Sequence, residues 1–287
     1  MTPEEYCQTK TATSGSSFYY SFLFLPPLKK QAIMAVYAFC REVDDVVDEC
    51  QDSAVARIKL AWWRDDIERV FHATPQHPVS KALAAVLPHF HLEKSHFLEI
   101  IAGMGMDLEQ HEYATFKELE VYCYKAAGVV GLLAAEIFGY QDSNTLKYAQ
   151  KLGIAFQLTN IIRDVREDLG RGRIYLPQED LARFQVHPQE LGLGKTTPNI
   201  KNLLAFQTQR ARDYYQEAFA ALAPVDRYTQ RSGIIMAEIY LDLLKEIEGD
   251  GYHVLTQRTR LTPLRKLWIA WKTARREKKF RHPVVTQ

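Results

Sequence analysis

The chain has 287 residues, of which 47% are hydrophobic and 25% are charged, the composition of an ordinary globular protein. Its four cysteines form no CxxC pair and no zinc-type cluster, no secretory signal is recognisable, and no run of 18 apolar residues would cross a bilayer. We therefore expect a cytoplasmic protein with reduced cysteines and without a structural zinc or a membrane-spanning segment.

Residues 4–12 are predicted to be helical and are followed by SGSSFYYSFLFLPP at 14–27. The serines and glycine of this segment cannot build a core, yet aromatic residues follow at once. Either the segment touches phosphate and leads into an apolar wall, or a serine caps the N-terminus of a core helix, which the sequence alone favours.

A helix with an acidic face is predicted at 28–50. On it Tyr37, Arg41, Asp44 and Asp48 lie about one turn apart, and their directions fall within a wedge of roughly 60°. The neighbouring positions are apolar. A single DxxxD pair usually forms a solvated face, so a metal site becomes a strong hypothesis only if a second acidic face exists.

That second face lies on a helix predicted from Gly153 to Leu169, GIAFQLTNIIRDVREDL. Asn160, Asp164 and Asp168 recur every fourth residue and Gln157 lies one turn earlier, so all four share one side of an ideal helix. Mg²⁺ prefers oxygen ligands and keeps positions open for water and phosphate. Two such faces opposed across a cavity would hold several Mg²⁺ ions and, through them, a diphosphate.

The remaining helices are predicted at 53–72, 78–88, 93–111, 116–139, 199–222, 228–248 and, as a basic C-terminal helix, about 262–281. Strand patterns are almost absent, so we predict an all-α fold. One domain spanning 1–287 is the simplest account, because no repeat and no flexible linker is found. The helix at 116–139 has a flank of small residues, which suits either close helix packing or a channel for a long apolar ligand. These residues are Ala126, Ala127, Gly128, Gly131, Ala134 and Ala135.

Other common catalytic motifs are absent from the sequence. GLGKTT at 192–197 is not a P-loop, because Gln189 stands where the pattern requires glycine and no strand precedes it. The histidines form no HExxH motif, and no glycine-rich dinucleotide fingerprint or Ser-His-Asp set can be placed.

Positive charge is concentrated at the C-terminal end. The formal net charge is +1, yet residues 258–287 carry ten Lys or Arg against one acidic residue, which gives +9 there and −8 in the remainder. Leu264, Leu267, Trp268 and Trp271 share one flank of the predicted helix. The helix either packs on the bundle with a solvated face or makes a peripheral contact with anionic lipid on the inner face of the membrane. Nucleic-acid binding is not expected, because the rest of the chain is acidic.

Taken together, these pieces resemble the squalene/phytoene synthase family of head-to-head prenyl synthases. The matching sequences are SGSSFYYSF, YAFCREVDDVVDE, YCYKAAGVVG, FQLTNIIRDVREDLGRGRIYLP and AEIYLDLL, which cover most of residues 6–255. The second acidic motif with its RxRIYLP tail is the most specific of them. The opening GSSFYYSFLFLPP and the length are most similar to the bacterial presqualene diphosphate synthases of hopanoid and squalene production.

The resemblance implies an isoprenoid synthase helical bundle around one central cavity, and a Mg²⁺-dependent condensation of two farnesyl diphosphates to presqualene diphosphate without NADPH. It implies metal ligands or near-ligands at Asp44, Asp48, Asn160, Asp164 and Asp168. It implies contacts to the prenyl diphosphates at Ser14, Ser17, Tyr37, Arg41, Gln157, Arg163 and Tyr240. It also implies that Phe18, Phe22 and the 126–131 flank line the prenyl channel and that Tyr122 lies near the reacting carbons.

Several outcomes stay open. Some relatives ionise the cyclopropane again and form squalene, dehydrosqualene or phytoene. The residues from Asp44 to Asp48 also satisfy the DDxxD string of cyclising or chain-elongating relatives, although no companion DDxxD occurs. A non-enzymatic helical scaffold with a basic tail would not be stabilised by Mg²⁺ and pyrophosphate. The acceptor of the proton lost in the reaction is either the departing diphosphate or Tyr122.

Overall fold

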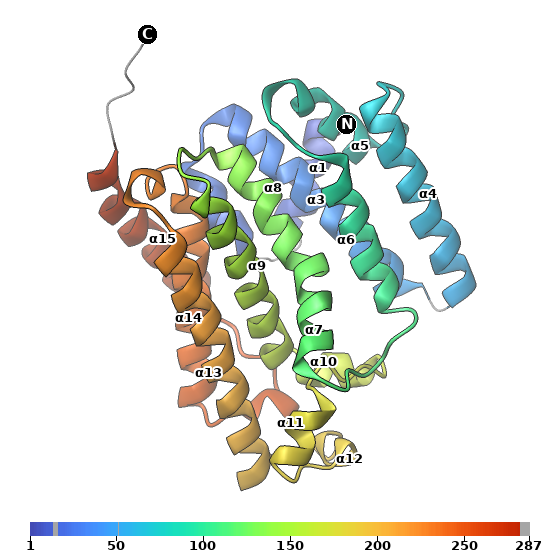
Figure 1. Cartoon of the computed structure of the whole chain (residues 1–287), viewed down its shortest axis with the longest axis vertical. Coiled ribbons are helices and arrows are strands. Elements are labelled where there is room, and N and C mark those ends of the chain that lie inside the picture. The colour runs from blue at the N-terminus through green and yellow to red at the C-terminus, as the bar shows by residue number, and fades with distance from the viewer. Residues whose placement is uncertain (14–16, 51, 282–287) are drawn as a thin grey trace.

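The structure, a computed structural model, describes residues 1–13, 17–50 and 52–281. It is a bundle of α-helices (Figure 1), and within these ranges it holds no strand, only an isolated bridge between Glu112 and Ile174. The all-α prediction is therefore confirmed. The longer helices are α3 (Pro27–Glu49), α4 (Ser53–Phe71), α6 (Lys94–Met106), α9 (Asn144–Arg163), α13 (Pro198–Ala221), α14 (Arg231–Gly249) and α15 (Pro263–Glu277). The shorter ones are α1 (Pro3–Thr13), α2 (Phe18–Ser21), α5 (Pro78–Val86), α7 (Phe116–Cys123), α8 (Val129–Phe138), α10 (Val165–Gly170), α11 (Gln178–Arg183) and α12 (Pro188–Leu191).

Local sequence explains many of the helix starts. Proline occupies the first turn of α3, α13 and α15, where its missing N–H leaves no helical bond unmade. Asp52 caps α4 by accepting bonds from the N–H groups of Ala54 and Val55. Thr197 and Thr262 cap α13 and α15 in the same way. These signals are local in the sequence, which is why the predicted starts of these helices lie close to the observed ones.

The apolar interior consists of two clusters of buried side chains. One is built on α3, α4, α5, α6 and α8, and the other on α9, α13 and α14. Phe18, Tyr124 and Ala126 pack against both clusters. α9 runs through the middle of the bundle in Figure 1 and contacts α8, α13 and α14. The helix that carries the second acidic motif is therefore held on several sides, and this fixes the direction of its polar face.

The second acidic segment differs from its prediction. α9 begins at Asn144, nine residues before Gly153, and it ends at Arg163 rather than continuing to Leu169. Asp164 has φ −102° and ψ 13°, which interrupts the helix before α10 begins. The N–H of Asp168 still donates to the carbonyl of Asp164 at 2.9 Å, so the two aspartates remain one turn apart. The prediction of one unbroken helix is wrong, but the spacing that it was based on survives.

The predicted helix at 116–139 is also modified. α7 and α8 are joined by a π-helical turn, Tyr124–Gly128, a feature that often marks functional sites. Phe116–Phe138 is the one helical stretch in the described ranges that is long and apolar enough to cross a membrane by length and composition. It packs against α3, α6 and α9 inside the bundle, and this packing accounts for its apolar character.

Candidate active site

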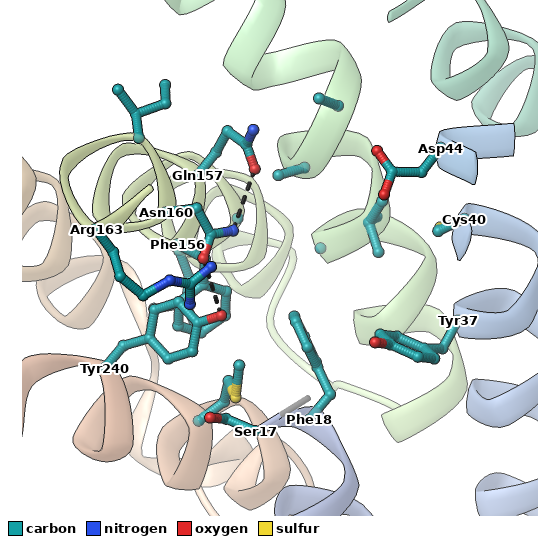
Figure 2. Close-up of a pocket in the computed structure, with 18 of the residues that line it drawn as sticks. Ser17, Phe18, Tyr37, Cys40, Asp44, Phe156, Gln157, Asn160, Arg163 and Tyr240 are labelled. Atoms are coloured by element: carbon teal, nitrogen blue, oxygen red, sulfur yellow. Dashed lines mark hydrogen bonds between the residues drawn. The ribbon is translucent and has the colours of Figure 1, made fainter. Parts of the chain in front are cut away.

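A large cavity lies between the helices of the bundle. Its volume is about 580 Å³, within the range of small-molecule sites. α3 supplies one wall and α9 the opposite one: Figure 2 shows Asp44 and Tyr37 facing Asn160 across the space. Residues of α2, α8, α14 and the segment 258–266 complete the lining.

Two aspartates project from α3 into this cavity, each beside an arginine. Arg41 donates to Asp44 Oδ2 over 2.6 Å, and Arg173, from the chain after α10, donates to Asp48 Oδ1 over 2.8 Å. Burial and the neighbouring Asp48 raise the pKa of Asp44 to about 7. The ionised form of a carboxylate whose pKa is raised in this way is stabilised by any additional cation, so this wall favours binding of a positive ion.

Amide and hydroxyl groups follow α9 on the opposite wall. Tyr240 of α14 donates to Asn160 Oδ1 at 3.1 Å, and Asn160 Nδ2 donates to Gln157 Oε1 at 3.4 Å, as the dashed lines in Figure 2 show. The side chain of Arg163 lies beside this pair in the same view. The network fixes the orientation of the Asn160 amide. Its oxygen has a second lone pair, which remains available to a cation.

Asp164 and Asp168 lie at the end of this wall, and their pKa values are shifted in opposite directions. Arg163 and Arg258 both donate to the carboxylate of Asp164, and these bonds outweigh burial and hold its pKa below the usual range. Asp168 has no side-chain ion pair within the described residues, and burial together with Asp164 raises its pKa to about 8. Beside it, Glu167 Oε2 is buried and has no hydrogen-bond partner among the described groups.

Another buried acid, Asp107, connects Tyr122 to the site. Tyr122 and Tyr175 donate to its two carboxylate oxygens at 3.1 and 2.7 Å, and their rings stack with centroids 5.0 Å apart. Burial raises the pKa of Asp107 to about 6, and burial with the Asp107 charge raises the pKa of Tyr122 well above its ordinary value. Tyr122 is therefore a neutral hydroxyl held in one orientation.

The remaining walls are apolar. The Phe18 ring lies 5.5 Å from Tyr37, 6.2 Å from Phe22 and 6.0 Å from Phe156, measured between centroids. On the side of α8 and the π-helical turn before it, the wall consists largely of small residues, which leave room that larger side chains would occupy. These are Ala126, Ala127, Gly131 and Ala134. The cavity is thus polar at the acidic walls and apolar elsewhere.

Two glycines explain how α8 approaches α9 so closely. A Cβ atom on Gly131 would stand 2.1 Å from the carbonyl oxygen of Ala149, and one on Gly153 would stand 2.2 Å from that of Ala127. Neither distance is tolerated by real atoms, so glycine is required at both positions. The small-residue flank therefore serves both of the roles that the sequence left open, close packing and cavity lining.

The structure brings together the residues that the sequence assigned to the site, except Ser14, which lies outside the described residues, and Gly128 of the small-residue flank, which faces Tyr124, Gln150 and Ile154 instead of the cavity. Those in the lining are Ser17, Phe18, Phe22, Tyr37, Arg41, Asp44, Asp48, Tyr122, Gln157, Asn160, Arg163, Asp164, Asp168 and Tyr240. Ser17 stands at the N-cap position of α2, but its side chain makes no cap hydrogen bond. Ser17 therefore does not cap the helix through its side chain, and the two serines before it, Ser14 and Ser16, lie outside the described residues.

Sequence reasoning missed several charged groups. Of the described residues in the lining, seven are Arg or Lys and six are Asp or Glu, so the arginines nearly balance the acids. Arg171, Arg173 and Tyr175 belong to the RxRIYLP motif. This motif supports the family resemblance, but no role was assigned to these three residues from the sequence. No sequence motif marks Asp107 or Arg258, because only the fold brings these two residues to the site.

The oxygen donors of the acidic walls suit a hard divalent cation, but they do not form a complete coordination site by themselves. Among the residues that the structure describes, no three acidic, histidine or cysteine side chains gather closely enough to hold an ion alone. The available donors are carboxylate and amide oxygens, the type that Mg²⁺ prefers. The raised pKa of Asp168 and the orphaned Glu167 Oε2 both indicate negative charge that lacks a partner. Oxygens of a bound diphosphate would be needed to complete the coordination.

The chain matches the family model described as squalene/phytoene synthase over residues 11–265. It is 36% identical over 282 residues to a 15-cis-phytoene synthase of Synechocystis sp., covering 93% of this chain and 84% of the relative. It is 38% identical over 279 residues to a phytoene synthase of Arthrospira platensis, covering 92% and 89%. A dehydrosqualene synthase solved in complex with ligand superposes with a TM-score of 0.86 at 29% identity, over 96% of this chain and 97% of that chain. Squalene synthase HpnC from Alicyclobacillus acidocaldarius superposes with a TM-score of 0.77 at 28% identity, over 87% and 94%. The chain therefore belongs to the squalene/phytoene synthase family of prenyltransferases and has its all-α isoprenoid synthase fold.

Proposed function

We propose that this protein condenses two farnesyl diphosphates head to head to presqualene diphosphate, with release of one diphosphate. The observation that carries the proposal is the meeting of two oxygen-bearing walls in one otherwise apolar cavity. Asp44 and Asp48 stand on α3, and Asn160, Asp164 and Asp168 stand on and after α9. This arrangement suits a substrate that has a diphosphate at one end and a long hydrocarbon chain at the other.

Divalent metal is used for diphosphate ionisation in this family, and we assign Mg²⁺ to the two acidic walls. Its ligands would be drawn from Asp44, Asp48, Asn160, Asp164 and Asp168. When bound, Mg²⁺ supplies Lewis-acid stabilisation of the negative charge that develops on the leaving diphosphate.

The arginines of the site have a role that follows from their present partners. Arg41 and Arg258 are paired with Asp44 and Asp164, which are also metal-ligand candidates. If a cation neutralised those carboxylates, Arg258 and the Nη1 group of Arg41 would be available to donate charge-assisted hydrogen bonds to phosphate oxygens, while Arg41 Nη2 stays bonded to Asp45. The same side chains thus keep the acidic walls stable without substrate and orient the diphosphate with it.

The apolar walls protect the reacting carbons. As the C1–O bond of one substrate breaks, the allylic cation must be kept from water. The rings of Phe18, Phe22 and Tyr37 lie in the cavity wall, and an aromatic face stabilises a nearby cation by about 0.5–2 kcal/mol. Attack by the alkene of the second substrate forms the new carbon–carbon bond, and loss of a proton closes the cyclopropane.

Tyr122 is unsuited to take that proton. Its hydroxyl lies within hydrogen-bond distance of Asp107 and of the Tyr175 hydroxyl, at 3.1 and 3.3 Å, and its pKa is raised well above the ordinary value by burial and by the Asp107 carboxylate. A neutral tyrosine is a weak base, so we assign the proton to the departing diphosphate, whose oxygens are already held at the acidic walls. Tyr122 then acts as an oriented dipole near the reacting carbons.

A second candidate is phytoene synthesis from two C20 prenyl diphosphates. It is favoured by the phytoene synthases of Synechocystis and Arthrospira, which share 36% and 38% of their aligned residues with this chain. The presqualene assignment is supported instead by the resemblance of the opening sequence GSSFYYSFLFLPP to presqualene diphosphate synthases. Further conversion to squalene would need a reductant such as NADPH, whereas formation of presqualene diphosphate needs none, so NADPH is not expected for the proposed reaction.

One experiment separates these products. The purified protein is incubated with Mg²⁺ and either farnesyl or geranylgeranyl diphosphate, with and without NADPH, and the products are identified by mass. We expect presqualene diphosphate from the C15 substrate, with no effect of NADPH. Phytoene from the C20 substrate, or squalene, would replace the proposal. No turnover of either substrate, together with no thermal stabilisation by Mg²⁺ and pyrophosphate, would indicate a non-enzymatic scaffold.

A further inference from the structure

The outward face of α15 is unusually apolar. Leu264, Leu267, Trp268 and Trp271 have exposed fractions of 79, 42, 56 and 52%. Their spacing of three, four and seven residues places them on one stripe along the helix. Large apolar side chains gathered in this way on a surface mark an interaction site more often than chance exposure does.

The opposite face of α15 is fixed to the bundle, so the stripe has a defined direction. Ile269, Ala270 and Ala274 are buried against it, and α15 packs along α14. The buried Glu277 accepts two hydrogen bonds from Arg227, each 2.9 Å long. α15 is therefore a rigid part of the fold, and its exposed stripe is not available for burial in the bundle.

Cations border the stripe. Lys272 lies 4.8 Å above the Trp268 ring, and Arg275 lies 5.6 Å from the Trp271 ring. Neither has an acidic partner within the described part of the chain. Tryptophan and leucine flanked by unpaired Lys and Arg are typical of helices that lie in the interface of an anionic bilayer. Of the ten Lys and Arg in residues 258–287, Arg258, Arg265 and Arg276 are paired with acidic side chains. The positive charge left for an anionic surface is therefore smaller than the sequence total of +9 but of the same sign.

The start of α15 lies at the edge of the cavity. Lys266 belongs to the cavity lining and also lies 5.4 Å above the ring of Tyr20, while the preceding residues 258–261 form part of the same wall. If the proposed function holds, a largely hydrocarbon product leaves the cavity next to this helix. A membrane in contact with the stripe would receive it without exposure to water.

From these observations we infer that the protein docks on anionic membranes through the exposed face of α15, with Leu264, Leu267, Trp268 and Trp271 in the lipid interface and Lys272 and Arg275 at the headgroups. In a cell, the surface would be the inner face of the cytoplasmic membrane. The docking geometry leaves the cavity and its acidic walls free to bind substrate.

The test is flotation of the full chain with vesicles of phosphatidylcholine alone or mixed equally with phosphatidylglycerol. We expect flotation only with the anionic mixture, and weaker flotation at high salt. The triple variant Leu264→Gln, Trp268→Gln, Trp271→Gln should lose roughly tenfold or more of the bound fraction. A matched control, Ile58→Gln, Val121→Gln, Leu193→Gln, changes three exposed apolar residues elsewhere and should float as the wild type does.

Two further readouts separate docking from misfolding and from self-association. The melting temperature and the Mg²⁺–pyrophosphate shift of the triple variant should equal those of the wild type, because the substituted side chains are exposed. Emission of Trp268 and Trp271 should shift to the blue on anionic vesicles. Equal flotation of the triple variant and the wild type would overturn the inference. So would a wild-type dimer in sedimentation that the triple variant abolishes, because the stripe would then bind a second copy. Neither result depends on which product the enzyme makes.

Discussion

Asp107 accepts a hydrogen bond from Tyr122 on one carboxylate oxygen and from Tyr175 on the other, at 3.1 and 2.7 Å. Tyr122 belongs to α7, and Tyr175 follows α10 in the chain, so one buried acid ties two distant segments together at the edge of the cavity. Asp107 is only 3% exposed. Its environment predicts how the protein responds to pH.

We expect Asp107→Asn to remove part of the pH dependence of stability. The folded-state pKa of Asp107 is raised to about 6, by burial above all, whereas an unfolded aspartate titrates near ~3.9. The folded protein thus holds this proton more tightly, so the stabilisation is complete below about pH 4 and is lost as the pH rises to about 6. Urea unfolding across this range should show the wild-type free energy of unfolding falling by about 2–3 kcal/mol more than that of the variant. Parallel curves would mean that Asp107 titrates normally.

The two acidic faces could be predicted from the sequence because the spacing of Asp44 and Asp48, and of Asn160 and Asp164, is a local property of helices. Several of the features that the sequence analysis missed depend on tertiary structure. The predicted helix at 93–111 ends at Met106, which releases Asp107 to meet the two tyrosines. By contrast, the first nine residues of α9 do carry a helical pattern that the prediction overlooked, since Thr145, Tyr148, Ala149 and Leu152 are buried at i, i+3, i+4 and i+7.

The arginines show the same limit. Arg173 reaches Asp48 across 125 positions of the chain, and Arg258 reaches Asp164 across 94. No periodicity or motif spacing predicts such pairs, because they depend on how α3, α9 and the segment after α14 are placed relative to one another. Sequence patterns therefore identified the acidic walls and the nearby Arg41 and Arg163, but not the cations Arg173 and Arg258, which come from distant parts of the chain.

The partners of the aspartates predict different costs for their substitution. Alanine at Asp44, Asp48, Asp164 or Asp168 should abolish turnover. Asp168→Asn is the clearest variant, because Asp168 has no ion pair within the described residues and its pKa is raised to about 8. We expect turnover to fall by about 10²–10³-fold with a melting temperature at or above that of the wild type at pH 8, since a costly charge is removed.

Asp48→Asn is the matched comparison. Arg173 is only 9% exposed and would lose its charged partner, so this variant should lose about 1.5–3 kcal/mol of stability as well as activity. Thermal unfolding and product formation, measured on both variants, test the pair together. Full turnover in Asp168→Asn would contradict the metal assignment.

Binding of Mg²⁺ and pyrophosphate should be stronger at pH 8 than at pH 6. Burial, with the neighbouring carboxylates, raises the pKa of Asp44 to about 7 and that of Asp168 to about 8, and a metal ligand must lose its proton before it binds. Each proton released weakens apparent affinity by about tenfold, or ~1.4 kcal/mol, per pH unit below its pKa. The thermal shift on adding Mg²⁺ and pyrophosphate should grow accordingly, and EDTA should abolish it. Pyrophosphate also titrates in this range, so Asp168→Asn serves as the control: if its shift changes with pH as much as that of the wild type, Asp168 is not the source.

The small residues beside the cavity predict two separable defects. Gly153→Ala should destabilise the fold by about 1–3 kcal/mol or more, because the new Cβ would meet the backbone of Ala127 at 2.2 Å and push α9 away. Gly249→Ala, at the end of α14 with nothing within 4 Å, should instead be neutral or stabilising by about 0.4–1 kcal/mol. Ala134 lines the cavity and also packs, partly buried, against the core cluster of α3, α4, α5, α6 and α8. Ala134→Leu should therefore cost less stability than Gly153→Ala while turnover falls, since the added carbons occupy space that the hydrocarbon chain needs. Unfolding curves and product assays on the three variants check this division. A cavity that tolerates leucine at Ala134 without loss of turnover would show that the prenyl chain lies elsewhere.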